Sequence, residues 1–274
     1  MEPIVYDGTC PACLRGEPNL CVQFGFLGLM GGGGGLAEYA VVPAGRAHVL
    51  PEGVSTETAA LVEPLAVAWH AVRRGGLTEG GSVAVVGAGP IGLGLLLAAK
   101  AQGAGFVAVS EIDAARRELA LGLGADLAVD PTEQDAAAEV LARVPGGVDA
   151  AFEASGAGRA AVDTLLAVVR KGGRAVTVAQ GGTAELDPTA LMVNEIVYTG
   201  SFAYDATDFP AVITALADGR LREESLTALV TDRIPLDRAD EDGYRELLAR
   251  GGAHVKILVR ADAADAADSA ASGA

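Results

Sequence analysis

The stretch that most constrains the fold runs from Val83 to Gly92, where an apolar segment of strand character leads into a glycine-rich turn. Gly87, Gly89 and Gly92 stand at the G-x-G-x-x-G spacing. In a strand–turn–helix unit, the first glycine permits a tight turn, the second lets the backbone approach a pyrophosphate, and the third lets the helix pack close to the strand. Pro90 suits the first helical turn, since the N–H that it lacks has no partner there.

The elements around this turn favour a dinucleotide site over an ordinary βαβ unit with a surface glutamate. An Ala/Leu-rich helix is expected over 93–102, and a second buried strand over 106–110. Glu111 stands at the end of that strand, where this type of fold has the acid that accepts hydrogen bonds from an adenosine ribose. An acid there repels a 2′-phosphate, so we expect NAD rather than NADP as the cofactor. Arg116 and Arg117, on the next helix, weaken that preference.

Charge and composition narrow the classes of function. The chain has 274 residues and a formal net charge of −16, so nucleic acid and anionic membrane surfaces are not expected as partners. No apolar run has the length of a membrane span, and no signal peptide is visible in the first residues. Three clustered cysteines do not make a disulfide framework. We therefore expect a globular, cytoplasmic protein with a large apolar core.

A group of metal-ligand residue types lies near the N-terminus. Asp7, Cys10 and Cys13 follow one another at intervals of three residues, and Cys21 comes next. Ligands separated by two residues can face one metal ion from a tight turn, and three thiolates with one carboxylate would complete a tetrahedral structural zinc site. One alternative is a redox Cys-Pro-Ala-Cys pair, which should lie at a helix N-terminus after a strand, and neither element is expected here. The other alternative is three reduced cysteines in a loop.

The next segment carries a glutamate in an unusual setting. Five glycines at 31–35 precede a stretch over 36–43 that is expected to be a strand of an antiparallel β region. A helix is expected over 57–71, with a kink at Pro64. Glu63 lies at that kink among apolar residues, and a buried carboxylate is costly unless it is paired or bound to metal. A solvent-facing glutamate at a helix break is the alternative.

From residue 80 onward, strands and helices alternate regularly. This alternation is typical of a parallel, doubly wound α/β sheet, whose ligands bind beyond the carboxyl ends of the strands. Ser155, Gly156 and the turn at 179–181 follow such ends and are candidates for contacts on the nicotinamide side, with simple turn chemistry as the alternative. The further strands are expected over 126–130, 148–154, 173–179 and 196–202, and the helices over 114–123, 132–143 and 160–169.

The alternation stops after residue 202. Here the expected helices cover 209–217 and 244–249, and the expected strands cover 226–234 and 254–259. His254 is expected at a strand edge rather than as a ligand. Residues 261–274 are rich in Ala, Asp and Ser and are expected to be disordered.

Several motifs taken together resemble the zinc-containing medium-chain alcohol dehydrogenases, in particular the butanediol and sorbitol dehydrogenase branch. The resemblance covers residues 1 to about 260. Its motifs are the Cys10/Cys13/Cys21 lobe, the segments 33–39 (GGGLAEY), 62–70 (VEPLAVAWH) and 85–92 (VVGAGPIG), and the short segments Glu153-Ala154-Ser155-Gly156 and Gly200-Ser201-Phe202.

This resemblance implies a Rossmann-type doubly wound parallel sheet and an incomplete GroES-like, β-rich catalytic domain. The implied division is a partial GroES-like domain with the zinc lobe at 1–65, the NAD-binding domain at 66–203, a return to the catalytic domain at 204–260, and the tail at 261–274. The implied NAD contacts are Gly87, Gly89, Pro90, Ile91, Gly92, Glu111, Ser155 and Gly156.

The resemblance also implies two zinc sites. The cysteine lobe corresponds to the family's structural zinc site, with Asp7 where the family usually has its first cysteine. Glu63 corresponds to the glutamate at the catalytic zinc, as a ligand or as the partner of the zinc-bound water. Members of the family reversibly oxidise a secondary alcohol or vicinal diol, because zinc lowers the pKa of the bound hydroxyl and the alkoxide then delivers hydride to the nicotinamide.

The sequence departs from the family at its start. In the family, the segment before the position of Met1 supplies the catalytic cysteine, the Gly-His-Glu histidine and the proton-relay residues. His48 is expected in a strand and His70 in a helix, and neither these nor His254 replace that segment by motif.

Three functions therefore stay open. The first is an NAD-dependent zinc dehydrogenase of a secondary alcohol, diol or polyol, which takes a small-molecule alcohol or ketone and is a homo-oligomer, dimer or tetramer, in its intact form. The second is a catalytically incomplete NAD-binding fragment or pseudoenzyme. The third and weakest is a zinc-independent quinone or enoyl reductase, against which the cysteine lobe and Glu63 both argue.

Overall fold

The computed structural model describes residues 1–30, 33–249 and 254–261 and contains two compact units. One unit is Pro51–Ser225, and the other joins Met1–Leu50 to the residues from Leu226 on. Within the described residues, no helix combines the length and the apolar character that crossing a membrane requires.

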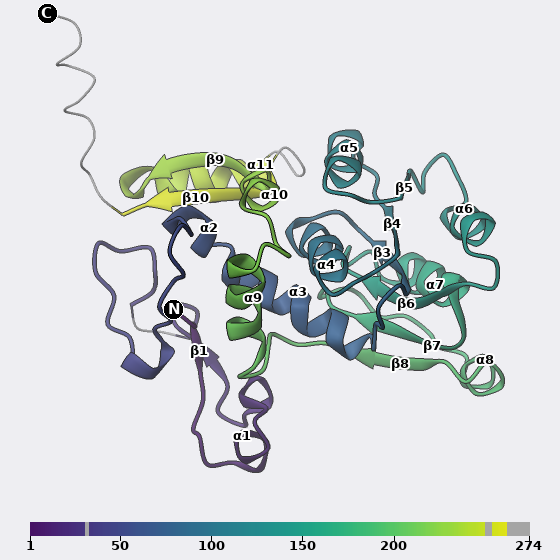
Figure 1. Cartoon of the computed structure of the whole chain (residues 1–274), viewed down its shortest axis with the longest axis horizontal. Coiled ribbons are helices and arrows are strands. Elements are labelled where there is room, and N and C mark those ends of the chain that lie inside the picture. The colour runs from purple at the N-terminus through teal and green to yellow at the C-terminus, as the bar shows by residue number, and fades with distance from the viewer. Residues whose placement is uncertain (31–32, 250–253, 262–274) are drawn as a thin grey trace, which may run out of the picture. The chain divides into compact units, whose positions relative to one another are not determined.

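The larger unit is built on a six-stranded parallel sheet with the order β5-β4-β3-β6-β7-β8 (Figure 1). The chain adds strands outward from β3 to β5, then returns to the other side of β3 and adds β6 to β8. This reversal confirms the expected doubly wound α/β sheet. Its strands are β3 (Ser82–Val86), β4 (Phe106–Ser110), β5 (Leu127–Val129), β6 (Val148–Glu153), β7 (Val169–Thr177) and β8 (Val197–Gly200).

Helices cover both faces of this sheet: α3 and α4 lie on one side, and α6 and α7 on the other (Figure 1). Short polar side chains begin several of them, because the Asp113 and Asp135 carboxylates accept hydrogen bonds from the orphan N–H groups of the first turn. The helices are α2 (Thr56–Ala59), α3 (Val62–Arg74), α4 (Pro90–Ala101), α5 (Ala114–Gly122), α6 (Ala136–Arg143), α7 (Arg159–Val168), α8 (Pro188–Val193), α9 (Asp208–Ala217) and α10 (Glu223–Thr227), the last of which crosses the unit boundary.

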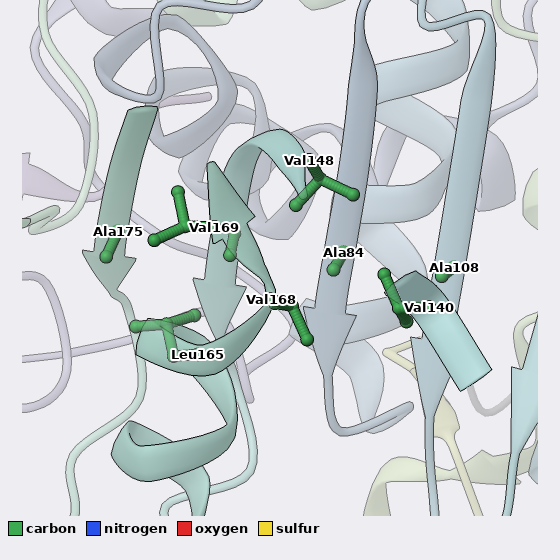
Figure 2. Close-up of a cluster of buried hydrophobic side chains, with 9 residues drawn as sticks. Ala84, Ala108, Val140, Val148, Leu165, Val168, Val169 and Ala175 are labelled. Carbon is green, nitrogen blue, oxygen red and sulfur yellow. The ribbon is translucent and has the colours of Figure 1, made fainter. Parts of the chain in front are cut away.

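One cluster of the core lies where α6 and α7 pack on the sheet. Figure 2 shows Leu165 and Val168 of α7 and Val140 of α6 among side chains of the strands, including Ala84 and Ala108. All five are almost fully buried. Strands that are covered on both faces need continuous apolar runs rather than alternating ones, which is why the sequence of this part is so rich in Val and Ala.

The unit boundaries differ from the expected ones at 65/66 and 203/204. They fall after Leu50 and after Ser225 instead. The reason is helix packing: α3 packs along α4, and α9 packs against α3, so the segments before and after the sheet belong to the same unit.

The sequence suggested that Pro64 kinks a long helix, but the structure has no such kink. The chain breaks earlier, at 60–61, and α3 then begins with Pro64 in its first turn. A proline is tolerated there because the N–H groups of the first turn have no intrahelical partner. The segment before the break, α2, is capped by Ser55, whose Oγ accepts the Thr58 N–H at 3.1 Å.

The smaller unit holds short elements around the cysteine lobe and a separate strand pair. Its elements are β1 (Ile4–Val5), α1 (Pro11–Leu14), η1 (Pro18–Leu20), β2 (Gly25–Phe26), η2 (Ala44–Arg46), β9 (Val230–Pro235), η3 (Leu236–Arg238), η4 (Ala239–Arg245), α11 (Glu246–Ala249) and β10 (Lys256–Arg260). β1 pairs with β2 in antiparallel fashion, and β9 pairs with β10 in parallel fashion.

One expectation for this unit is wrong, and two of its elements differ from the expected ones in their bounds. The segment 36–43 is not a strand: no described strand pairs with it, and Tyr39 and Val41 are more than 90% exposed. The strand expected within 226–234 is β9, which begins at Val230 because α10 occupies the first residues of that range. The helix expected over 244–249 is present, as the end of η4 followed by α11. The expected disordered tail, after Ala261, and the first two glycines of the 31–35 run lie outside the described residues.

A partly buried ionic cluster connects α3 to α9. His70 Nδ1 lies 2.7 Å from Asp208 Oδ2, and the Arg73 guanidinium contacts both Asp208 and Asp205. The Asp208 side chain is fully buried, so its charge depends on these partners. Although His70, Asp205 and Asp208 could together hold a metal ion, the arginine already supplies the positive charge. We interpret the cluster as a structural clamp.

Replacing Asp208 with Asn should lower the free energy of unfolding of the larger unit by about 2 kcal/mol or more, because Arg73 and His70 lose a buried partner. Asp163→Asn is the matched control: Asp163 pairs with Arg159 on the exposed surface of α7, where an ion pair contributes at most about 1 kcal/mol. Urea unfolding followed by circular dichroism measures both. Equal effects of the two substitutions would contradict the clamp.

Candidate functional site

A pocket of about 340 Å³ opens at the carboxyl ends of β3, β4 and β6. Its wall contains four of the residues that the sequence predicted as cofactor contacts: Gly87, Gly89, Glu111 and Ser155. The other four, Pro90, Ile91, Gly92 and Gly156, adjoin it in the chain but are not part of the wall. The place agrees with the rule that ligands of doubly wound sheets bind where the strand order reverses.

The glycine-rich turn is compact because its glycines let backbone groups approach one another. Gly87 has a φ of +98°, and its N–H donates to the Ser110 carbonyl at 2.7 Å. A Cβ atom on Gly92 would lie 1.9 Å from the Gly87 carbonyl oxygen, so no other residue fits there. Gly89 is the N-cap of α4, and Pro90 occupies the first turn. The N-terminus of α4 thereby adjoins the pocket, where its N–H groups favour an anion.

Glu111 holds a fixed carboxylate in the pocket wall. The residue is 8% exposed, its Oε2 accepts the Ala88 N–H at 2.6 Å, and its Oε1 accepts the Asp113 N–H at 2.9 Å. A carboxylate has about four acceptor positions, so these two bonds leave capacity for hydroxyl donors from a ligand. The bond to Ala88 also ties the acid to the glycine-rich turn.

The two arginines of α5 have different surroundings. Arg117 interacts with other residues of the protein: it donates a hydrogen bond to the Glu111 carbonyl at 2.8 Å and forms an ion pair with Asp130 at 2.9 Å. Arg116 lines the pocket, and its Nη1 lies 4.0 Å from the place that a Cβ on Gly89 would take. Of the two, only Arg116 therefore contributes a cation to the pocket wall, beside the turn expected to hold a pyrophosphate.

Sequence reasoning missed part of the site. Pro131, Ala160 and Thr164 line the pocket but carry no signal that would distinguish them from ordinary loop and helix residues. Glu153 is different: it ends β6, is 3% exposed, and its Oε1 accepts three hydrogen bonds from the following turn. A glutamate within an apolar strand was the available signal, the same anomaly that drew attention to Glu63.

In the smaller unit, Asp7, Cys10, Cys13 and Cys21 converge. One ligand atom from each lies within 4.8 Å of all the others, and the Cys10 and Cys13 sulfurs are 3.6 Å apart. Tetrahedral coordination with Zn–S bonds of about 2.3 Å requires sulfurs about 3.8 Å apart. The donor set and its spacing therefore fit a zinc ion.

Backbone N–H groups prepare this cluster for a cation. Hydrogen bonds from the Cys10 and Thr9 N–H groups lower the pKa of Asp7 to about 2, so its carboxylate is charged at neutral pH. The N–H groups of Cys13 and Val22 lower the pKa of the Cys10 thiol. Burial, together with the neighbouring Cys21 and Cys10 thiols, raises the pKa of Cys13 to about 12. Without a metal, these groups cannot all carry a negative charge; a zinc ion would remove that conflict.

The structure has the strand and the helix N-terminus that were not expected around the Cys-Pro-Ala-Cys segment. Cys10 is in fact the N-cap of the short helix α1, and the two-residue strand β1 precedes it. The pattern favours metal nonetheless, since a third thiol and a carboxylate complete the cluster. All three cysteines are free thiols in the structure.

Within the described part of the chain, no group of three or more metal-ligand residues forms around Glu63. Among the described residues, the two groups able to hold a metal are the Asp7 cluster and the His70 group, and neither includes Glu63. Glu63 lies in the first turn of α3 and is half-buried. His48, expected in a strand, is in a loop and contacts Glu2 at 2.9 Å. His254 lies just before β10 and contacts Thr231 at 3.2 Å.

Comparison with known proteins agrees with both units. The family model described as "Zinc-binding dehydrogenase" matches residues 90–218, and the one described as "Alcohol dehydrogenase GroES-like domain" matches residues 1–52. The (R,R)-butanediol dehydrogenase of Bacillus subtilis is 39% identical over 90% of this chain and 70% of its own length. The chain belongs to the zinc-containing medium-chain alcohol dehydrogenase family.

Solved structures of this family have the same fold. The 2R,3R-butanediol dehydrogenase of B. subtilis superposes with a TM-score of 0.84 over 95% of this chain and 72% of that one. An alcohol dehydrogenase from Escherichia coli CFT073, complexed with NADH, is 27% identical and superposes with a TM-score of 0.84 over 94% of this chain and 75% of that one. The (R,R)-butanediol dehydrogenase of Saccharomyces cerevisiae is 35% identical over 91% of this chain and 66% of its own length. The chain thus spans about two thirds of the length of the curated relatives that it matches.

We expect the purified chain to bind about one zinc ion, and Asp7→Asn to weaken that binding by at least about tenfold, because a neutral amide replaces a charged ligand. Inductively coupled plasma mass spectrometry after gel filtration gives the stoichiometry, and competition with a chromogenic chelator gives the affinity. Asp7→Cys is the control that should retain the metal. A wild-type chain that holds no zinc after growth and purification in its presence would contradict the site.

Proposed function

We propose that the protein is an NAD-dependent, zinc-type oxidoreductase that interconverts a secondary alcohol, vicinal diol or polyol with its ketone. The observation that carries the proposal is Glu111, a carboxylate fixed in the wall of the pocket beside the glycine-rich turn. The names of its relatives supply the substrate class, since they include butanediol dehydrogenases and sorbitol dehydrogenases.

The pocket residues support the binding of a dinucleotide. The N–H groups at the start of α4, with Arg116 beside them, favour a pyrophosphate. Glu111 would accept hydrogen bonds from a ribose hydroxyl, and its charge would repel a 2′-phosphate, which supports NAD over NADP. The bound nicotinamide supplies hydride acceptance or donation; the chain's own residues orient the dinucleotide against the edge of the sheet.

The reacting half of the site is less complete. Glu63 is proposed at the catalytic zinc by its match to the family motif, but neither of the two groups of described residues that could hold a metal includes it. A catalytic zinc needs three protein ligands, so we derive no step through that metal. This observation supports a second candidate: a chain that binds NAD and one structural zinc without turning over an alcohol.

The proposal also covers the cellular compartment and the oligomeric state of the protein. Its three clustered cysteines do not make a disulfide framework, which supports the cytoplasm. β8 is an edge strand of the sheet, and Val197, with the neighbouring Met192 and Val193, is exposed along it. Apolar surface at an unpaired edge supports a homo-oligomer.

NADH binding tests the proposal directly. We expect enhanced NADH fluorescence with the wild-type chain and an affinity for NADPH at least about tenfold lower, because of repulsion at Glu111. Glu111→Gln should weaken NADH binding and reduce the preference for NADH over NADPH. Glu118 is an exposed glutamate on the same helix as Arg116, and Glu118→Gln should change neither the affinity nor the preference. NADH binding together with oxidation of 2,3-butanediol or sorbitol identifies the dehydrogenase; binding without oxidation identifies the second candidate. Absence of NADH binding rejects both.

A further inference from the structure

Glu153 is a buried carboxylate that cofactor binding, as described so far, leaves without a role. It is the last residue of β6, the strand next to β3, and is 3% exposed. One oxygen, Oε1, accepts the Ser155 N–H at 2.8 Å, the Gly156 N–H at 2.7 Å and the Ser155 hydroxyl at 2.8 Å. The carboxylate therefore organises the turn that follows its own strand.

This turn is held tightly against the glycine-rich turn. A Cβ on Gly87 would lie 2.9 Å from Ser155 Cα, so only glycine lets the two turns meet. Gly156 has a φ of +68°, and a Cβ there would lie 2.8 Å from the Gln180 carbonyl oxygen. The Glu153 carbonyl also accepts the Val178 N–H at 2.9 Å. Glu153 thus connects the ends of β6 and β7 at the edge of the sheet where the pocket opens.

The hydrogen bonds of the Ser155 hydroxyl decide whether it can donate to a ligand or accept from one. Because Glu153 Oε1 already accepts two backbone N–H groups, it is an acceptor, and the Ser155 hydroxyl must be the donor between them. The Ser155 oxygen also accepts the Ala157 N–H at 3.1 Å. A hydroxyl has one proton and two lone pairs. Ser155, which is exposed and lines the pocket, is left with one lone pair and no proton.

We propose that Glu153 is a positioning residue that makes Ser155 a hydrogen-bond acceptor for a ribose hydroxyl of the bound dinucleotide. The proposal rests on the proposed function, since it assumes NAD in this pocket. Phosphate oxygens only accept hydrogen bonds and cannot pair with Ser155 in this state. Among the donors of the dinucleotide, the ribose hydroxyls are favoured because Glu111, in the same wall, also presents acceptor oxygens.

The test is NADH titration by fluorescence with the full chain and five variants, one of them a control. Ser155→Ala should weaken NADH binding about fivefold, and Glu153→Ala at least about tenfold, as expected for loss of buried hydrogen bonds. Glu153→Gln should restore most of the affinity, because an amide oxygen can accept the same three bonds. The double variant Glu153→Ala/Ser155→Ala should bind NADH no more weakly than Glu153→Ala does. The reason is that both substitutions remove the same hydrogen bond between Ser155 and the ligand. Glu79→Gln, an exposed glutamate just before β3, is the control and should leave the affinity unchanged.

Reduced nicotinamide hypoxanthine dinucleotide, which lacks the adenine amino group, separates that donor from the ribose hydroxyls. The penalty of Ser155→Ala should be the same with this analogue as with NADH; a penalty that disappears would assign the contact to the base and overturn the ribose assignment. Additive effects in the double variant would show that Glu153 acts on the fold and not through Ser155, and would overturn its positioning role.

The remaining outcomes separate this inference from the proposed function. If the wild-type chain binds NADH and Ser155→Ala binds it equally well, the inference alone is overturned. If the wild-type chain does not bind NADH, the proposed function and the inference fall together. Thermal unfolding of each variant identifies any that does not fold; should Glu153→Ala be one, Ser155→Ala and the hypoxanthine analogue still decide the question.

Discussion

Everything at the proposed cofactor site depends on β3 being paired on both of its edges. Because β4 and β6 flank it in parallel register, the turns that follow all three strands meet at one edge of the sheet. The Gly87 N–H reaches the Ser110 carbonyl, and the Ala154 N–H reaches the Val86 carbonyl, so each turn is hydrogen-bonded to a neighbouring strand end. The pocket exists because these turns cannot move apart without breaking the ladder.

In several turns of this acidic chain, a carboxylate accepts hydrogen bonds from the backbone N–H groups of the turn. Glu111 accepts the Ala88 N–H of the glycine-rich turn, Glu153 accepts the N–H groups of the next turn, and Asp7 accepts those of the cysteine lobe. Each carboxylate satisfies backbone donors that would otherwise be orphaned, and each also lies at a proposed ligand site. The same side chains therefore serve folding and binding, and a loss of binding on their substitution has to be separated from a loss of fold.

Much of the larger unit could be predicted, because its local patterns agree with its packing. The strand over 106–110 was predicted with its observed bounds, and the helix from residue 114 with its observed start. Predictions failed where tertiary partners decide. The segment 36–43 has the alternation of a strand, yet no described strand pairs with it. Pro64 looked like a kink, yet it falls in a first turn because the helix breaks earlier.

The sequence by itself determined the parallel sheet, the glycine-rich turn with its acid, and the candidate metal ligands, since each of these depends on residues close in the chain or on strand periodicity. Only the tertiary structure decided which residues share the pocket. It placed Ser155 and Glu111 in the wall of the same pocket, although 44 positions separate them in the sequence. It also paired Arg117 with Asp130 and placed Arg116 in the pocket wall. It also left Glu63 apart from the metal clusters of the described residues. These outcomes depend on strand order and side-chain direction, which bring together residues that no spacing in the sequence relates.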